Sequence, residues 1–592
     1  MKARFILGAS AGAIALAGAG VEIVERRSGA PFVSPIDLAG SACGGAGTGP
    51  GATRAYFISV GRALAAGSLG DDPGAAVIPM QVGSIAYRIS TAAPAAQAQF
   101  DAGLAHMWNF NHGAAVAAFR EAQRADPACA MCFWGEALAL GPNINAPMAA
   151  DDAPAAWAAV RKAVALKGGA DAKEQMLIDA LAARYAEKPP TDRSALDAAF
   201  ADAMDKVAAA YPDDDFIAVL SAEANMDTQP WDYWETDGRT PKGRTARTLS
   251  LIEAVLARNP DHVAAIHLYI HITENTSNPY RAAPFAERLG ALSPGLGHLV
   301  HMPSHTYYKI GRFKESIAAN IEAVAADEAE LAKGPAHPMY EFGYYVHNIH
   351  FVMTSAMMAG DAETSLAMAA KLDAKLPTEM AAGVPFAQPI KAAPYFAQAM
   401  FGDPETILAL EDPGPDVPFL QGLRRYARGE AEARRGNAAA ARAEADAIAA
   451  LLRDADFSAL EGGLIPVRDI LEIARLTVIA RASDAEGDLA GAIEAMEEAV
   501  ALQDGLNYTE PPYWYYPARQ TLAALVLKQG DAERAEALFL ETLVESPNNG
   551  WALYGLSEAY RAQGDRSGAK YAAGLFKDAW AGAPKALTLA RL

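Results

Sequence analysis

Several residue types are scarce in this sequence. Of 592 residues only 3 are cysteine and 11 are histidine, and 71 acidic residues outnumber 50 basic ones, which gives a net charge of −21. Without a basic stripe the chain has little to neutralise phosphates, so nucleic acid is excluded as its main partner. After the N-terminus no apolar run is long enough to cross a bilayer. We therefore do not expect an integral membrane protein.

Cys129 and Cys132 form the motif CAMC. Haem attachment would require histidine next, where Phe133 stands, and a redox motif would require a βαβ context that the surrounding pattern lacks. The pair is therefore either a local disulfide or two buried thiols. Cys43 lies in a Gly- and Ala-rich stretch with no apolar run before it, which gives poor support for a lipid anchor.

Residues 1–19 have the pattern of a secretory signal peptide. Lys2 and Arg4 precede an apolar stretch that ends near Leu16, and the small residues Ala17 to Ala19 fit a cleavage site. The stretch is too short for a spanning helix. We therefore expect a periplasmic or secreted protein.

Strand signals almost disappear after residue 95, and Ala-rich segments with helical periodicity dominate. Gly530-Asp531 and Gly564-Asp565 are two turns 34 residues apart, and Pro260 and Pro294 have the same spacing. A 34-residue period of paired helices with a closing proline is the tetratricopeptide pattern. The sequence thus predicts an all-α, tetratricopeptide-like α-solenoid with aromatic-rich insertions and a short non-helical N-terminal cap.

The pattern divides the mature chain into four parts. These are a Gly- and Ala-rich linker and cap (20–93), N-terminal repeat-like helices (94–257), histidine-rich repeats (258–375) and C-terminal repeat-like helices (376–592).

Nine of the 11 histidines fall between residues 262 and 350. Counted from Pro260 and from Pro294, the pairs His267/His271 and His301/His305 occupy the same repeat positions. Histidines four residues apart on a helix can reach one metal ion. The first helix of a tetratricopeptide pair lines the concave groove, so we expect these side chains to face a cleft. The predicted ligands are His267, His271, His301, His305, His347 and His350, with His298 as a further candidate.

Imidazole ligands suit copper, zinc, iron or nickel, and six of them exceed the needs of one ion. Two copper ions that share the histidines three and three would resemble, in chemistry alone, the dinuclear sites of phenol oxidases. Such a site would oxidise a small aromatic molecule. Mononuclear zinc with Glu274 as general base is the alternative and would give a hydrolase. Glu274 and Tyr308 occupy equivalent repeat positions, and both are candidate catalytic residues.

A non-catalytic adaptor with a peptide in its groove is a third interpretation. Three aromatic insertions interrupt the repeats and could roof the groove, where their side chains would stack an aromatic or extended ligand. Packing of these aromatics onto the edge of the solenoid is the alternative. The candidate substrate-binding residues are Trp231, Tyr233, Trp234, Tyr345, Trp514 and Arg519.

The chain resembles a family of bacterial secreted tetratricopeptide proteins. The similarity runs from about residue 99 to 560 and rests on the segments FNH, DPACAMCFWGEALALGPNINAPM, PWDYW, HLYIH, GHLVHMPSH, YYVHNIHF, EPPYWYYPARQTL and NNGWALYGL. The resemblance implies no particular reaction. It adds His112, Asn143 and Asn145 as groups that approach the groove beside the ligands, with turn capping as the alternative role.

Overall fold

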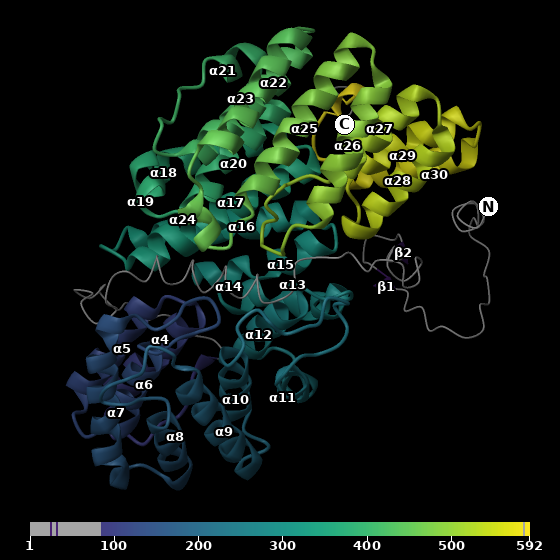
Figure 1. Cartoon of the computed structure of the whole chain (residues 1–592). Helices are drawn as coiled ribbons and strands as arrows, with labels where there is room; N and C mark the ends of the chain where they lie inside the picture. Colours follow the sequence, from purple (N-terminus) through teal and green to yellow (C-terminus); the bar gives the residue numbers. More distant parts are fainter. Residues whose placement is uncertain (1–23, 26–30, 33–84, 584–586) are drawn as a thin grey trace.

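The computed structural model describes residues 24–25, 31–32, 85–583 and 587–592 (Figure 1). Almost all regular structure in these residues is helical, and β1 (Val24–Glu25) and β2 (Pro31–Phe32) form one short antiparallel pair. The predicted signal peptide (1–19) and Cys43 lie outside the described residues.

The helices of the first half of the chain are α4 (Pro94–Trp108), α5 (His112–Ala125), α6 (Ala130–Ala139), α7 (Ala153–Leu166), α8 (Ala172–Ala182), α9 (Ser194–Ala210), α10 (Asp215–Asp227), α11 (Thr245–Arg258), α12 (Val263–Thr273), α13 (Ala283–Leu292), α14 (Gly297–His301) and α15 (Pro303–Lys309). Short turns of other helix types join them at η3 (Ala150–Asp152), η4 (Lys167–Gly169) and η5 (Pro279–Ala282).

The second half contains α16 (Phe313–Leu331), the π-helical turn η6 (Met339–Tyr344), α17 (Tyr345–Ala359), α18 (Ala362–Lys375), α19 (Thr378–Gly383), α20 (Ala387–Phe401), α21 (Pro404–Leu408), α22 (Pro418–Arg434), α23 (Ala438–Asp454), α24 (Ser458–Gly462), α25 (Val467–Glu486), α26 (Leu489–Asp504), α27 (Ala518–Gln529), α28 (Ala532–Glu545), α29 (Gly550–Ala562), α30 (Arg566–Ala579) and η8 (Leu589–Arg591).

The predicted repeat turns are present. Gly530 ends α27 in the left-handed conformation at φ 107°, where a residue with Cβ would be strained, and the Asp531 side chain caps α28 by accepting from the Arg534 backbone N–H. Gly564 and Asp565 repeat this arrangement between α29 and α30. Sequential helices pack as antiparallel pairs, so the predicted all-α, tetratricopeptide-like solenoid is confirmed.

The solenoid has two large apolar cores. One extends from Ile85 to Tyr344 and the other from Tyr308 to Leu592, and Figure 1 shows the corresponding lower and upper lobes with α13–α15 between them. The helices that carry the clustered histidines, α12, α14, α15 and α17, lie where the two cores meet. A site at this junction is walled by both halves of the chain.

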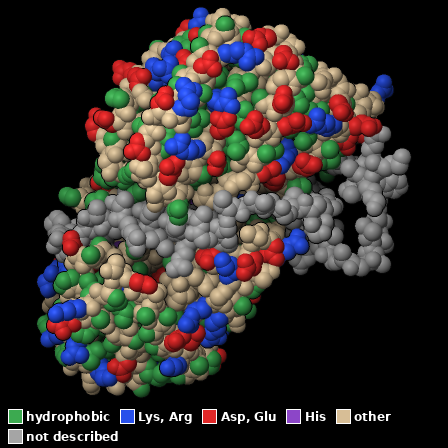
Figure 2. Space-filling model, in the orientation of Figure 1, with side chains coloured by type: hydrophobic (Ala, Val, Ile, Leu, Met, Phe, Trp, Pro, Cys, Tyr) green, Lys and Arg blue, Asp and Glu red, His purple; other side chains and the backbone are tan. Residues whose placement is uncertain are grey.

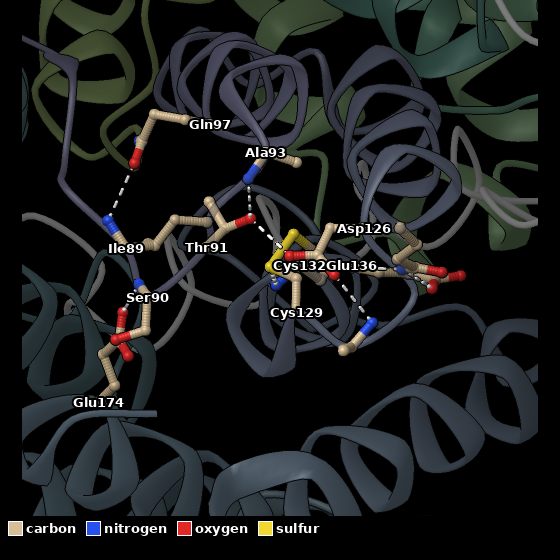
Figure 3. Close-up of a disulfide and its surroundings, with 12 residues drawn as sticks. Ile89, Ser90, Thr91, Ala93, Gln97, Asp126, Cys129, Cys132, Glu136 and Glu174 are labelled. Carbon is tan, nitrogen blue, oxygen red and sulfur yellow. Dashed lines mark hydrogen bonds between the residues drawn. A yellow bond between two sulfur atoms is a disulfide. The ribbon is translucent and has the colours of Figure 1, made fainter. Parts of the chain in front are cut away.

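Residues 85–93 are the described part of the cap and contain no α-helix. Thr91 Oγ1 donates to Asp126 Oδ2 at 2.5 Å, close to a disulfide between Cys129 and Cys132 at the start of α6 (Figure 3). Of the two sequence alternatives for CAMC, the structure contains the local disulfide. It fixes the first turn of α6.

Acidic and basic side chains are interspersed on the face of the molecule in Figure 2, without a basic stripe. Within the part of the chain that the structure describes, no helix has the length and apolarity needed to cross a bilayer.

Candidate metal centre

Local sequence explains how α14 and α15 deliver their histidines. Gly297 begins α14 directly against the buried Asp327, whose carboxylate would collide with any Cβ at that position. Pro303 begins α15 at the first helical position, which it tolerates because that N–H has no partner inside the helix. The sequence predicted one helix through this region. The proline divides it into two, yet His301 and His305 still face the same space.

The first group of imidazoles, which we call the first trio, consists of His267, His271 and His298. All three side chains are buried, and one ring nitrogen from each lies within 4.8 Å of the others. His267 Nε2 and His298 Nε2 are 3.1 Å apart. Two helices, α12 and α14, supply the trio.

The second trio consists of His301, His305 and His347, which come from α14, α15 and α17. His301 Nε2 and His305 Nε2 are 2.8 Å apart, and the His347 ring centroid lies 4.7 Å from that of His301. His301 Nδ1 donates to Asn320 Oδ1 at 2.6 Å, which directs Nε2 into the trio.

These separations suit ligands of one ion. Two nitrogens that each bind an ion at about 2.0–2.1 Å lie about 3.3 Å apart in a tetrahedral site and closer together at smaller angles. The paired Nε2 atoms of both trios, at 3.1 and 2.8 Å, are close to that separation. The trios are also neighbours, because the ring centroids of His271 and His305 are 5.8 Å apart. The arrangement can hold two adjacent ions with three imidazoles each.

Glu274 links the two trios. Its Oε1 accepts a hydrogen bond from His271 Nδ1 at 3.1 Å, and its Oε2 forms an ion pair with His305 Nδ1 at 2.5 Å, so it contacts one histidine of each trio. The carboxylate is fully buried between them. A carboxylate that accepts the Nδ1–H of an imidazole fixes its orientation and leaves Nε2 with a free lone pair for a metal ion.

The charges agree with this assignment at five of the six trio histidines, and His305 is the exception. Burial would raise the pKa of Glu274, but His305 and His271 outweigh it and hold the pKa well below its ordinary value. Burial would lower the pKa of His305, yet Glu274 raises it above the usual value. Burial and the neighbouring imidazoles lower the pKa of the other five trio histidines, so these five are neutral near pH 7. Neutral imidazole is the form that binds a metal ion.

A phenylalanine covers each trio. The Phe110 ring centroid is 4.7 Å from that of His267 and 4.8 Å from that of His298. The Phe351 centroid is 5.0 Å from His301 and 4.8 Å from His305. These rings shield the imidazoles from water and leave the remaining side open to a cavity.

Two aromatic residues at the first trio have unusual backbone angles. Phe110 has φ 53° and Trp231 has φ 61°, in the left-handed region that costs a residue with Cβ about 1 kcal/mol or more. The Trp231 ring meets His271 edge-on with centroids 5.3 Å apart, and its Nε1 donates to Asn145 Oδ1 at 3.1 Å. Such strain persists where the surrounding structure holds the side chain in a required place.

The open side of the trios faces a cavity of about 110 Å³, which we call the histidine cavity. Its polar wall includes His271, His298, His305, His347 and His350. The opposite wall comes from the C-terminal half of the chain and is largely apolar, with Phe396, Phe419, Leu423 and Ile470. The histidines line a small, partly open cavity and most of them are almost fully buried, whereas the sequence suggested a broad open groove.

A second depression, which we call the outer groove, has a volume of about 710 Å³. It lies between Tyr308 and Lys309 on one side and the segment 503–519 with α28 on the other. The wall that it shares with the histidine cavity consists of Thr509, Glu510, Pro512, Tyr513 and Tyr515.

The structure places His350 outside both trios. His350 Nε2 is 2.8 Å from the Tyr515 hydroxyl, although the histidine still lines the cavity. His298, the additional candidate, takes the sixth place instead. The sequence assigned six histidines to two ions without dividing them between the ions; backbone spacing does not fix a side chain's partner, and the structure groups His298 with the others in place of His350.

The residues added by the resemblance lie beside the first trio. His112 Nδ1 donates to the Ala139 carbonyl at 2.8 Å, and His112 Nε2 lies 3.2 Å from Asn143 Nδ2. The centroid of the His112 ring is 6.1 Å from that of Phe110. Asn143 Oδ1 also accepts from the backbone of Asn145 and so stabilises its own turn. Asn145 reaches the cavity and positions Trp231.

Tyr308 does not reach the histidine cavity. It lines the outer groove, and its ring lies 5.7 Å from Phe351. Burial raises the pKa of its hydroxyl far above the ordinary value, so the group remains protonated. The structure therefore gives no support to direct participation of Tyr308 at the trios.

Of the six predicted substrate-binding residues, Trp231 alone lines the histidine cavity. Trp234 Nε1 donates to the Ile272 carbonyl at 2.7 Å, and the Tyr345 hydroxyl donates to Glu328 at 2.8 Å. Trp514 and Arg519 line the outer groove. Tyr233 is buried beside Trp231, with ring centroids 6.5 Å apart.

Three aromatic residues at the site were not among the predicted residues. Tyr513 lines the cavity, Phe110 and Phe351 cover the trios, and all three occur in segments that the resemblance emphasised. Asn320 was also missed. Its signal is a polar residue at a buried position in the middle of α16, where an apolar side chain would be expected.

No protein-family profile and no curated protein matches the chain. Among solved structures, it is similar to the Cut9–Hcn1 hetero-tetramer of the APC/C, with 13% identity over 78% of this chain and 76% of that one and a TM-score of 0.28. The human IFIT1 dimer with m7Gppp-AAAA has 11% identity over 80% and 95%, with a TM-score of 0.31. The P58(IPK) TPR domain has 13% identity over 79% and 98%, with a TM-score of 0.21. These loose superpositions carry no argument about function.

Proposed function

We propose that this protein is a metalloenzyme that binds two metal ions, preferably copper, in its two histidine trios and oxidises a small aromatic or phenolic molecule. The single observation that carries the proposal is the pair of adjacent three-imidazole groups joined through Glu274. Copper bound by imidazoles would supply one-electron chemistry and activation of dioxygen.

The donor set supports this choice of metal. Each trio offers neutral nitrogen ligands, with no thiolate and no carboxylate among the grouped ligand atoms in the described residues. Calcium and magnesium prefer oxygen ligands, so they are poor candidates. Iron and manganese sites commonly add carboxylate ligands, whereas copper and zinc accept three histidines alone.

The cavity supports a small aromatic substrate. Its apolar wall is built from aromatic and aliphatic side chains that would pack on a ring, and the histidines face this wall from the other side. Because most trio histidines are buried, an extended peptide in an open groove has no access to them. The adaptor interpretation is therefore less favoured.

A zinc hydrolase with Glu274 as general base is also less favoured. Both oxygens of Glu274 are already engaged, Oε1 by a hydrogen bond from His271 and Oε2 by an ion pair with His305, and its pKa is low. A carboxylate with no free oxygen and low basicity is suited to orienting ligands and is a poor proton acceptor.

We further propose that the protein works outside the cytoplasm, in the periplasm or as a secreted protein. The signal-like residues 1–19 motivate this proposal. The Cys129–Cys132 disulfide supports it, because disulfides persist in oxidising compartments.

The proposal is tested by elemental analysis of protein purified from periplasm without chelators. We expect about two copper ions per chain, bound by the two trios. The His301→Ala/His305→Ala double variant should lose the ion of the second trio, with unchanged helical content by circular dichroism. A matched control is His262→Ala, which changes a histidine of the same region that caps α12 and belongs to neither trio.

About one zinc ion per chain would overturn the dinuclear copper proposal and direct the search to ester and amide substrates. Metal-free protein, or a double variant that retains full metal content, would overturn the assignment of the trios. With two coppers present, consumption of dioxygen with a panel of phenols is the activity assay.

A further inference from the structure

Glu510 lies in the wall between the histidine cavity and the outer groove and lines both. It is the one carboxylate among the described residues that line the histidine cavity. Its position at the junction places it where a molecule from the outer groove would meet the histidines.

The two oxygens of Glu510 have different surroundings. Oε1 accepts from the Tyr508 hydroxyl at 2.5 Å. Oε2 is buried and has no hydrogen-bond partner among the described residues. A buried carboxyl oxygen without a partner costs free energy unless a ligand satisfies it. Glu274, in contrast, uses both oxygens on the trios.

The groups around Glu510 prepare it for proton exchange. Burial raises its pKa most strongly, and the Glu274 carboxylate adds to this, while Lys309, His305 and the Tyr508 hydroxyl lower it. The hydroxyl of Tyr308, which lines the outer groove, is kept protonated by burial, which raises its pKa. A carboxyl group whose pKa lies closer to neutrality is a better proton acceptor and donor than an ordinary glutamate.

We propose that Glu510 is a catalytic base that takes the proton of a phenolic substrate's hydroxyl through Oε2, so that the substrate binds beside the trios as an anion. The substrate O–H bond breaks, an O–H bond forms on Glu510, and no electron is transferred in this step. This inference rests on the proposed function, because the positive charge of ions in the trios is what favours an anionic substrate.

The test counts protons when phenol binds to the metal-loaded full-length chain. Isothermal titration calorimetry is done in two buffers with different enthalpies of ionisation. Wild-type protein should release no net proton, because Glu510 retains it, and its phenol affinity should be constant between about pH 7 and pH 8. Glu510→Gln should release one proton per phenol, with an affinity that rises about tenfold per pH unit, because phenols ionise near pH 10.

Glu541→Gln is the matched control, since Glu541 lines the outer groove and not the histidine cavity, and it should behave as wild type. A wild-type protein that releases one proton, or a Glu510→Gln variant that releases none, overturns the assignment. If the variant does not fold, the ultraviolet spectrum of phenol bound to the wild type decides, because the phenolate anion absorbs at longer wavelength than neutral phenol; a spectrum of neutral phenol overturns the assignment.

Elemental analysis of the same sample separates the two proposals. Phenol that binds metal-free wild type and Glu510→Gln equally, without proton release, overturns the role of Glu510 together with the metal centre. If Glu510→Gln has its full metal content and releases one proton when phenol binds, the role of Glu510 is supported.

Discussion

The two trios differ in how firmly their imidazoles are held. In the second trio, Asn320 fixes His301 Nδ1 and Glu274 fixes His305 Nδ1. In the first trio, Glu274 fixes His271 alone, and the buried Nδ1 atoms of His267 and His298 have no protein partner among the described residues. Phe110 packs on these two rings in place of a hydrogen-bond acceptor.

This difference separates two ways of orienting a ligand. Polar contacts at Nδ1 orient two rings of the second trio but only one ring of the first, whose other two rings are held by packing against Phe110. The second trio also has the more open environment, because His347 is partly exposed to the cavity. We therefore expect the second trio to be the one that contacts substrate and the first to hold its ion in a more enclosed site.

The largest expected effect comes from the group that both trios share. Glu274→Gln replaces two acceptor oxygens by one, and its amide N–H₂ faces an imidazole N–H. We expect metal affinity to fall about tenfold to a hundredfold at each trio. Competition with a chelator, followed by elemental analysis, measures the affinity of each ion.

Glu444→Gln is a suitable control, because Glu444 is a buried glutamate that pairs with Arg425 and Arg428 far along the chain. If Glu274→Gln weakens one ion and leaves the other unchanged, Glu274 does not link the trios.

A second prediction concerns His112 and His350, two buried histidines that lie near the trios but belong to neither. Burial lowers the pKa of His112 to about 4 and that of His350 to about 3, against about 6.5 in the unfolded chain. Because both folded-state values are lowered, the stability they contribute is present above pH 6.5 and is lost as the pH falls. At pH 5 each should account for a loss of about 2 kcal/mol.

His350→Gln and His112→Gln should each remove this part of the pH dependence. Urea unfolding of chelator-treated protein at pH 7 and pH 5 measures it. Between pH 7 and pH 5 the stability of each variant relative to wild type should improve by about 2 kcal/mol. Below pH 4 the effects of the two substitutions on stability should diverge. His112, with the higher folded-state pKa, is then protonated in the folded wild type before His350 is, so its contribution stops changing first. If the difference in unfolding free energy between variant and wild type is the same at pH 7 and pH 5, burial of the histidine is not the cause of the pH dependence.

The smallest effect should be confined to the second trio. Asn320→Leu removes the acceptor for His301 Nδ1 and should lower the affinity of that ion about tenfold. The first trio should keep its affinity. Asn320→Asp retains an acceptor oxygen and is the matched control in the same chelator competition. A loss at both trios would mean that the two sites are not held independently.

Repeat spacing predicted much of the candidate site. The in-register positions of His267/His271 and His301/His305 follow from the 34-residue period, because equivalent residues of adjacent repeats occupy the same face. The same reasoning could not place His350, which forms a hydrogen bond to Tyr515 from a segment 165 residues away. It could not find the contact of His301 with Asn320 either, since that contact depends on how α14 packs against α16.

The sequence by itself determined the helical repeat, its turn residues and the presence of a histidine cluster, because helix propensity, capping and the repeat period act over short distances along the chain. Only the tertiary structure decided how six imidazoles divide into two trios, that Glu274 joins them, and that the segment 509–515 closes the cavity over them. These arrangements depend on the meeting of two cores whose residues are distant in the chain, and on burial that no local pattern records.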